Sequence, residues 1–216
     1  MGVEKLTADE LVRLYGPWAR RTPSDAAELL VDYPGTWWIA GGWAIDAFTG
    51  TERDHADLDV CVLVDELPVL RRHLSGRLDV WAAVGGALSP VLPDVEPAGA
   101  AADVLPDGCG QLWTRRSGTD PWEYDILLAP GSPDLWIYKR DDAFQLPMSE
   151  ALWQHDGIRY LRAEIQLLYK ASRQRAKDEA DFAEILPYLD KNRRRWLRMA
   201  LHSTLPDHPW LDRLTT

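Results

Sequence analysis

Two aspartates at alternate positions of an apolar segment are the residues whose spacing best suits chemistry. Asp57 and Asp59 share one face of a predicted strand over 57–64, because alternate residues of a strand point the same way. Their Cα atoms would lie about 6.5–7 Å apart, so both carboxylates can converge on one divalent cation or on two neighbouring ones. Without a cation, mutual repulsion and lost hydration would disfavour two ionised groups so close together. The pair predicts a magnesium site, although a short Asp-x-Asp is frequent and both side chains could simply face water.

A glycine pair upstream strengthens this interpretation. Gly41 and Gly42 follow a predicted strand over 36–40 and open a predicted helix over 43–48. The backbone N–H groups of such a strand-to-helix turn face one point, an arrangement that suits a phosphate group. The turn alone is a weak signal. Followed closely by Asp57-x-Asp59, it favours a nucleotide held through a metal ion.

The sequence resembles the aminoglycoside nucleotidyltransferase family, within the DNA polymerase β-type nucleotidyltransferase superfamily. The resemblance is carried by Gly41-Gly42-Trp43-Ala44-Ile45-Asp46, then Arg53, His55 and Asp57-Leu58-Asp59-Val60, and it is strongest over residues 36–65. The superfamily pattern is a glycine turn, an Asp-x-Asp and a third carboxylate on a later strand. The resemblance implies a nucleotidyltransferase fold, two Mg²⁺ ions, and ATP or another nucleoside triphosphate as co-substrate.

The third carboxylate implied by the resemblance is assigned to Asp125, on a later predicted strand. In the family this residue helps to bind metal and can accept the proton of the attacking hydroxyl. Glu123 lies on the same predicted face and is the rival, and Asp79 on another predicted strand is a poorer one. We therefore expect Asp57, Asp59 and Asp125 to be the catalytic residues and the metal ligands.

The resemblance also implies a set of nucleotide contacts. Arg53 and His55 lie in the loop before Asp57, where Arg53 could touch phosphate and His55 could orient a carboxylate, or both could simply be exposed. Lys170 follows a predicted apolar helix face, from which its ammonium could reach the triphosphate or extend into water. Glu164 is a further candidate for contact with substrate. The residues expected at the nucleotide are Gly41, Gly42, Trp43, Arg53, His55 and Lys170.

The elements that must position these residues follow from apolar periodicity. The order of elements predicts an α+β fold, with a mixed β-sheet and packed helices in a nucleotidyltransferase domain at 1–143. A C-terminal helical domain is expected at 144–216. The stretch 85–108 is rich in proline, glycine and alanine and is expected to be an irregular connection. Predicted helices cover 6–15, 24–32, 43–48 and 66–74, and predicted strands cover 36–40, 57–64, 77–84, 111–116 and 122–128.

Composition restricts the partners. The chain has 216 residues and a formal net charge of −10, which argues against extended binding to a nucleic-acid backbone. The charge favours a cationic substrate, or a phosphate ligand whose charge is met by metal. No apolar run approaches the roughly 20 residues needed to cross a bilayer, and the N-terminus lacks a secretory apolar segment. Together with only two cysteines, Cys61 and Cys109, this predicts a cytoplasmic protein, expected to be monomeric.

These expectations combine into one reaction. A nucleoside monophosphate, AMP from ATP in the first instance, passes to a hydroxyl of a small molecule, and pyrophosphate leaves. The family suggests an antibiotic as acceptor, an aminoglycoside or a lincosamide, and hence antibiotic resistance. Three alternatives remain at this point: a toxin-like transferase that modifies a protein or another acceptor, a nucleotide-binding module without turnover, and an unrelated phosphohydrolase that uses Asp57-x-Asp59.

Overall fold

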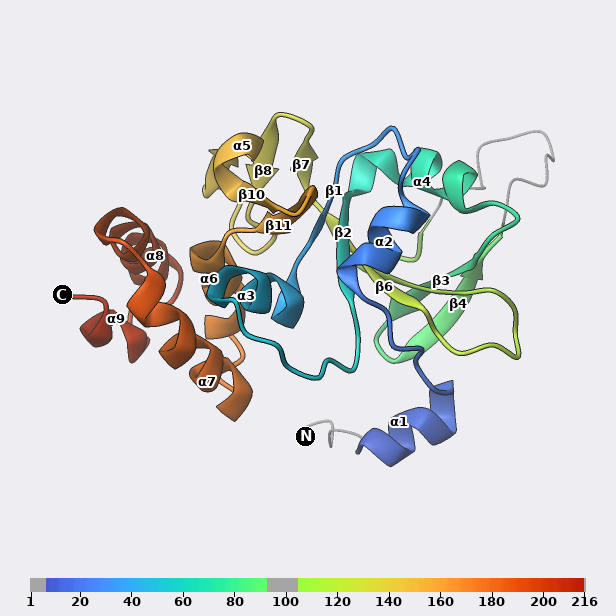
Figure 1. Ribbon diagram of the computed structural model, residues 1–216, viewed down its shortest axis with the longest axis horizontal. Helices are drawn as coiled ribbons and strands as arrows, with labels where there is room; N and C mark the ends of the chain where they lie inside the picture. The colour runs from blue at the N-terminus through green and yellow to red at the C-terminus, as the bar shows by residue number, and fades with distance from the viewer. Residues whose placement is uncertain (1–6, 93–104, 216) are drawn as a thin grey trace.

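A mixed eight-stranded sheet lies at the centre of the computed structural model, which describes residues 7–92 and 105–215 (Figure 1). Its strand order is β10-β11-β1-β2-β6-β5-β3-β4, and a three-stranded sheet, β7-β8-β9, lies beside it. The α+β fold predicted from the sequence is therefore confirmed. The strands are β1 (Trp37–Ile39), β2 (Asp59–Leu63), β3 (Asp79–Val84), β4 (Ala87–Val91), β5 (Gln111–Arg115), β6 (Tyr124–Ala129), β7 (Gly131–Ser132), β8 (Leu135–Ile137), β9 (Gln145–Pro147), β10 (Leu152–His155) and β11 (Ile158–Leu161).

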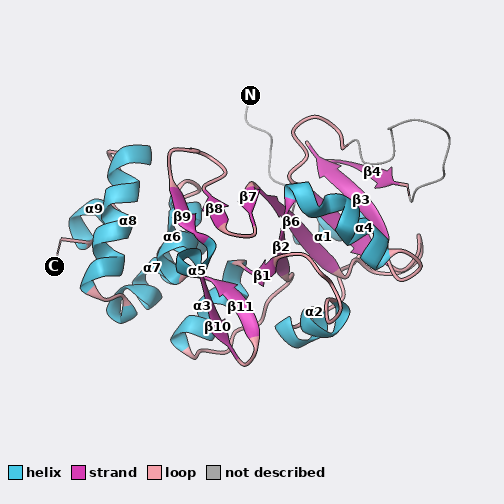
Figure 2. Ribbon diagram, turned by 90° about the horizontal axis from the view of Figure 1, so that it is seen from above, coloured by secondary structure: helices cyan, strands magenta, loops and turns pink. Residues whose placement is uncertain are grey.

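Helices pack on both faces of the large sheet and form the C-terminal part of the chain (Figure 2). On one face, Val60 and Val62 of β2 lie in a core with α2 and α4. On the other face, Cys61 and Leu63 lie in a second core with α6 to α9. This alternation along β2 is the one that the sequence predicts. The helices are α1 (Ala8–Tyr15), α2 (Pro23–Leu29), α3 (Gly41–Thr49), α4 (Leu67–Leu74), α5 (Met148–Ala151), α6 (Ala163–Ala171), α7 (Ala176–Ile185), α8 (Lys191–Thr204) and α9 (Trp210–Arg213), with short 3₁₀ turns at Val64–Glu66 and Leu186–Tyr188.

The strand order places the predicted acidic residues side by side. β2 pairs with β6 in parallel, and Asp59 lies opposite Asp125 in this register. The β5–β6 hairpin predicted from the sequence is confirmed as an antiparallel pair. Asp57 precedes β2, which begins at Asp59 and is shorter than the predicted strand.

Two hairpins contain strands that the sequence did not predict, namely β4 in the first and both β10 and β11 in the second. β3 and β4 are joined by Gly85-Gly86, both at positive φ, so β4 occupies part of the predicted connection at 85–108, of which 93–104 lies outside the described residues. β10 and β11 are joined at Asp156-Gly157, also both at positive φ. Gly-Gly and Asp-Gly pairs favour such tight hairpins.

The β10–β11 hairpin also bears on the division of the chain. β11 pairs in parallel with β1, so the large sheet takes two strands from the region beyond residue 144. The helical part begins with α6 at Ala163. The division into two domains stays a proposal, with a sheet hairpin included in its second part. Among the described residues, none of the helices has the length and apolar character required to span a membrane.

Candidate active site

Three carboxylates converge at one end of β2 and β6. Asp57, Asp59 and Asp125 each offer one oxygen, and these oxygens all lie within 4.8 Å of one another. Asp57 is exposed, Asp59 is half-buried and Asp125 is buried. A cluster of this size with oxygen ligands is what a hard divalent cation requires.

The electrostatics of this acidic cluster favour a bound cation. Burial, followed by the charge of Asp57, raises the pKa of Asp59 to about 6. Burial and the charge of Asp59 raise the pKa of Asp125 well above its ordinary value, against a hydrogen bond of 2.5 Å that Gln111 Nε2 donates to its Oδ2. The other oxygen, Oδ1, is buried and has no hydrogen-bond partner among the described residues. Buried carboxylate oxygens that lack partners fit Mg²⁺, which would supply the missing charge.

The glycine turn brings a helix terminus against these acids. Helix α3 begins at Gly41 and has no side-chain cap, because Ala40 occupies the N-cap position. Gly41 has a φ of +68°, and a Cβ there would lie 1.9 Å from Asp59 Oδ2. Its N–H donates to Gln166 Oε1 at 2.9 Å, which ties α6 to the turn. Glycine is therefore required here by close approach, and the uncapped end of α3 lies beside the acidic cluster.

His55 covers the same turn. Its Nε2 lies 2.8 Å from Asp46 Oδ2, so the carboxylate that it contacts is that of Asp46. Its ring centroid lies 4.6 Å from that of Trp43. A Cβ on Gly42 would lie 2.5 Å from His55 Cε1. The structure thus brings Gly42, Trp43 and His55 into contact on top of the α3 terminus.

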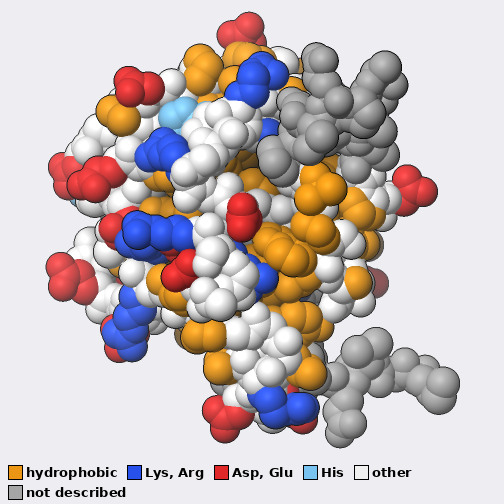
Figure 3. Space-filling view, turned by 90° about the vertical axis from the view of Figure 1, so that its right-hand side faces the viewer, with side chains coloured by type: hydrophobic (Ala, Val, Ile, Leu, Met, Phe, Trp, Pro, Cys, Tyr) orange, Lys and Arg blue, Asp and Glu red, His pale blue; other side chains and the backbone are white. Residues whose placement is uncertain are grey.

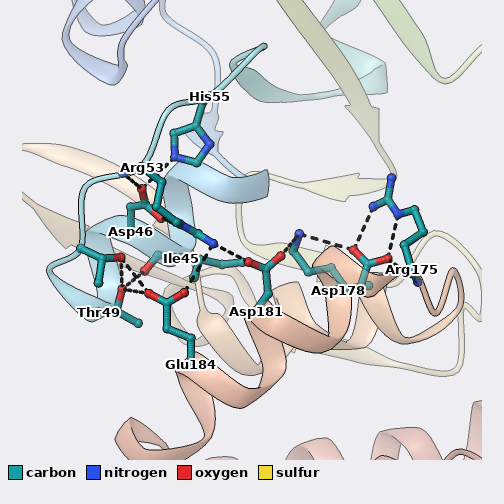
Figure 4. A network of polar contacts seen from close by, with 11 residues as sticks. Ile45, Asp46, Thr49, Arg53, His55, Arg175, Asp178, Asp181 and Glu184 are labelled. Carbon is teal, nitrogen blue, oxygen red and sulfur yellow. Dashed lines mark hydrogen bonds and ion pairs between the residues drawn. The ribbon is translucent and has the colours of Figure 1, made fainter. Parts of the chain in front are cut away.

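Arg53 joins the turn to the C-terminal helices (Figure 4). Its Nε donates to Asp46 Oδ1 and its Nη1 to Asp181 Oδ1 of α7, both at 2.7 Å. Burial works to lower the pKa of Arg53, but the hydrogen bonds to Asp46 and Asp181 outweigh it and raise the pKa. Asp181 also pairs with Lys170 of α6 at 2.6 Å, and Lys170 lies 3.7 Å from Asp178. Arg53 and Lys170, predicted at the nucleotide, are therefore held by carboxylates in this network.

Further basic residues face the acidic cluster from the junction of α6 and α7. The pKa of Asp59, raised chiefly by burial and by Asp57, is drawn back down by Lys170, Lys177 and Arg173. Arg175, hydrogen-bonded to Asp178, interacts electrostatically with Asp57. The sequence analysis did not select Arg173 or Arg175. The signal was present in the alternating basic residues Arg173, Arg175 and Lys177.

The rival carboxylates lie outside the acidic cluster. Glu123 pairs with Arg21 at 2.6 Å and with Arg116 at 3.2 Å. Asp79 is exposed at the start of β3. Glu164 is buried, its Oε2 has no hydrogen-bond partner among the described residues, and burial raises its pKa. Of these candidates, only Asp125 is gathered with Asp57 and Asp59.

Similar proteins were found with a family model and among solved structures. The family model described as aminoglycoside-2''-adenylyltransferase matches residues 24–79. The crystal structure of ANT(2")-Ia in complex with adenylyl-2"-tobramycin superimposes with a TM-score of 0.51 at 16% identity, over 82% of this chain and 92% of that one. The lincomycin-bound lincosamide antibiotic adenylyltransferase LnuA has a TM-score of 0.47 at 14% identity, over 74% and 91%. A solution structure of ANT(2'')-Ia has a TM-score of 0.46 at 18% identity, over 82% and 86%. Comparison with curated proteins gave no significant match.

The chain therefore shares the fold of ANT(2")-Ia, and its residues 24–79 are similar to the aminoglycoside-2''-adenylyltransferase family. The resemblance of residues 24–79 to aminoglycoside-2''-adenylyltransferases is the one that the sequence predicted. The glycine turn and Asp57-x-Asp59 both lie inside the matched residues 24–79.

Replacing Gly41 should disable the site through a local clash. In Gly41→Ala the new methyl group would displace the Asp59 carboxylate, so we expect the Mg²⁺-dependent rise in melting temperature to disappear. Gly50→Ala is the matched control, because Gly50 also has a positive φ (+74°) but nothing lies within 4 Å of its added Cβ. Thermal unfolding with and without Mg²⁺ measures both. If Mg²⁺ raised the melting temperature of Gly41→Ala as much as that of the wild type, the contact between position 41 and Asp59 would not control metal binding, and this prediction would be wrong.

The raised pKa of Asp59 predicts that, in the absence of metal, ionisation of this residue lowers the free energy of unfolding as the pH rises. This pKa is about 6 in the folded protein and about 4 in an unfolded chain, so folding favours the protonated acid. Its contribution to stability is present below about pH 4 and is lost as the pH rises through about 6. In EDTA at pH 7, Asp59→Asn should therefore be more stable than the wild type, by on the order of 2 kcal/mol. Urea unfolding of the two proteins from pH 4 to 7.5 measures this difference. If the unfolding free energies of the wild type and Asp59→Asn depended on pH in the same way, the raised pKa of Asp59 would be excluded as the cause.

Loss of Arg53 should separate the turn from α7. Arg53→Gln removes the arginine from the buried Asp46 and leaves the buried Asp181 with Lys170 alone, and should cost roughly 2–4 kcal/mol of unfolding free energy. Arg20→Gln is the control, because the pair of Arg20 with Asp54 is exposed, and it should change stability by less than about 0.5 kcal/mol. Urea denaturation of the two variants provides the comparison. Equal losses of unfolding free energy in the two variants would show that the buried ion network stabilises the protein no more than an exposed ion pair does.

Proposed function

We propose that the protein transfers AMP from ATP, or another nucleoside monophosphate from its triphosphate, to a hydroxyl of a small-molecule acceptor and releases pyrophosphate. The observation that carries this proposal is the convergence of Asp57, Asp59 and Asp125 beside the uncapped N-terminus of α3. A module that only senses a nucleotide does not need three converging carboxylates. Their convergence supports turnover over sensing.

The acidic cluster fits magnesium. Asp57, Asp59 and Asp125 would hold two Mg²⁺ ions, since the raised pKa values of Asp59 and Asp125 and the unpartnered Oδ1 of Asp125 call for cationic charge. When bound, these ions would neutralise the triphosphate and lower the pKa of the acceptor hydroxyl.

The residues of the chain would then bind and orient the reactants. The end of α3 and the basic residues at the α6–α7 junction supply positive electrostatic potential for the triphosphate. Asp125, oriented by Gln111, would accept the proton of the acceptor hydroxyl. The hydroxyl oxygen forms a bond to the α-phosphorus, while the bond from the α-phosphorus to the pyrophosphate oxygen breaks. The barrier falls through positioning and charge, without a covalent intermediate.

An antibiotic is the acceptor class that the comparisons support. The matching family model is that of aminoglycoside-2''-adenylyltransferases, and a structural neighbour holds adenylyl-2"-tobramycin. An aminoglycoside is therefore the first acceptor to test, and antibiotic resistance is the physiological role that we propose. We also propose that the enzyme acts as a monomer in the cytoplasm.

Mass spectrometry tests the reaction. The protein is incubated with labelled ATP, Mg²⁺ and an antibiotic panel that includes tobramycin and lincomycin, and an acceptor should gain the mass of one adenylate. Asp57→Asn and Asp59→Asn should lower the rate by roughly a thousandfold or more, because each removes a metal ligand, and Asp125→Asn should be nearly as damaging.

The control for these variants is Asp54→Asn, in which an exposed carboxylate of the same loop is replaced. It should retain full activity. Full activity in both Asp57→Asn and Asp59→Asn would end the proposed mechanism. Phosphate release from ATP without any acceptor would instead identify a phosphohydrolase.

A further inference from the structure

The sheet face that carries Asp125 continues into a cluster of aromatic rings. Trp113 of β5 lies opposite Asp125 in the β5–β6 register, and Trp81 of β3 lies opposite Trp113 in the next. Directly opposed residues of antiparallel strands point to the same face of a sheet, so both indoles lie on the face of the acidic cluster. We call the cluster the aromatic wall, and its residues are Tyr15, Trp18, Trp81, Trp113 and Trp122.

The rings of the aromatic wall pack against one another, and part of their surface remains exposed to solvent. Trp113 meets Trp18, Trp122 and Tyr15 edge to face, with centroid distances of 5.0, 5.3 and 5.7 Å. Trp122 is buried, whereas the other rings are half-buried. Figure 3 shows hydrophobic side chains gathered on the side of the molecule where β3, β4 and α1 lie. The wall thus offers a firm apolar surface beside the proposed base.

The position of the aromatic wall assigns it to the acceptor. From β2 the glycine turn lies in the direction of β1, whereas the wall lies in the opposite direction, across β6 on β5 and β3. Neighbouring strands are about 4.8 Å apart, so Trp113 is one strand away from Asp125. A molecule whose hydroxyl reaches Asp125 from the side away from the nucleotide must therefore lie against Trp113.

The charges around the aromatic wall do not suit a polycation, although the protein as a whole is acidic. Glu123 at its margin is paired with Arg21 and Arg116. The exposed Asp79 has an arginine, Arg115, as its neighbour in the β3–β5 register, so positive charge also lies close to this carboxylate. A polyamine needs carboxylates that are not already paired, because each ammonium group loses hydration on binding.

Arg115 adds positive charge to the aromatic wall itself. Its guanidinium lies over the ring of Trp122 at 4.1 Å and over that of Trp81 at 4.9 Å. A cation held on an aromatic face repels further cations that approach the same rings. The wall therefore combines an apolar surface with a local excess of arginine.

We infer that the acceptor is a hydroxylated small molecule of low positive charge that lays the apolar face of a ring on Trp113 and presents its hydroxyl to Asp125. The inference rests on the proposed function and narrows its acceptor class. Within the antibiotic panel it favours the weakly basic lincomycin over the polyamine tobramycin. Stacking on an indole holds a ring close to Asp125 without requiring charge.

Calorimetric titration of the full chain tests the assignment, in the presence of Mg²⁺ and a non-hydrolysable ATP analogue. Lincomycin should bind at least about tenfold more tightly than tobramycin. Trp113→Ala should weaken lincomycin binding about tenfold, whereas Trp113→Phe keeps a ring and should stay within about threefold. Trp153→Ala, at a half-buried tryptophan of β10 at the opposite edge of the sheet, is the control and should have no effect.

A charge variant keeps the test informative if Trp113→Ala folds poorly. Arg116 has a side chain that is 69% exposed and pairs with Glu123, so Arg116→Glu adds an acid beside the aromatic wall without disturbing a core. It should strengthen tobramycin binding about threefold or more and leave the affinity for the ATP analogue unchanged.

Each outcome has a distinct meaning. Tighter binding of tobramycin than of lincomycin by the wild type, no binding of lincomycin, or equal lincomycin affinity in Trp113→Ala would overturn the inference. In those cases, retained Mg²⁺-dependent binding of the ATP analogue leaves the proposed function standing. Absence of that nucleotide binding would instead defeat the proposed function.

Discussion

Mutual repulsion among three carboxylates, crowded onto the ends of two neighbouring strands, is the constraint on which the rest of the site depends. Burial adds to the repulsion and raises the pKa values of Asp59 and Asp125. Only part of the cost is offset within the protein, by Gln111 at Asp125 and by the basic residues of the α6–α7 junction. The repulsion that remains is one that divalent cations would relieve. Under the proposed function, binding of metal and nucleotide would relieve this repulsion.

The C-terminal helices belong to this site as much as the sheet does. Gln166 accepts the N–H of Gly41, and Asp181 bridges Arg53 and Lys170. These contacts fix the glycine turn against α6 and α7 from the side that carries the basic residues. The opposite side of the acidic cluster has aromatic rings in place of helices. The two sides thus differ in chemistry, and in our proposal the basic side receives the phosphate chain and the aromatic side the acceptor.

The sequence predicted the local features of the site and missed those that depend on long-range pairing. Alternation along β2 identified Asp59 and its apolar neighbours, but the assignment of Asp125 relied on family resemblance, because strand order is not encoded in any local pattern. The partner of Arg53 on α7, Asp181, is 128 residues away in the sequence, so the ion network could not be foreseen. Asp156-Gly157 carries a hairpin signal, but it lies in a region for which the helical periodicity predicted helices alone.

A crystal structure of the protein with Mg²⁺ and a non-hydrolysable ATP analogue tests the central claim most directly. The account predicts two cations coordinated by Asp57, Asp59 and Asp125, with the triphosphate running from the end of α3 toward the α6–α7 junction. A nucleotide bound elsewhere on the molecule, or one bound at α3 while the three carboxylates turn away from any cation, would contradict it.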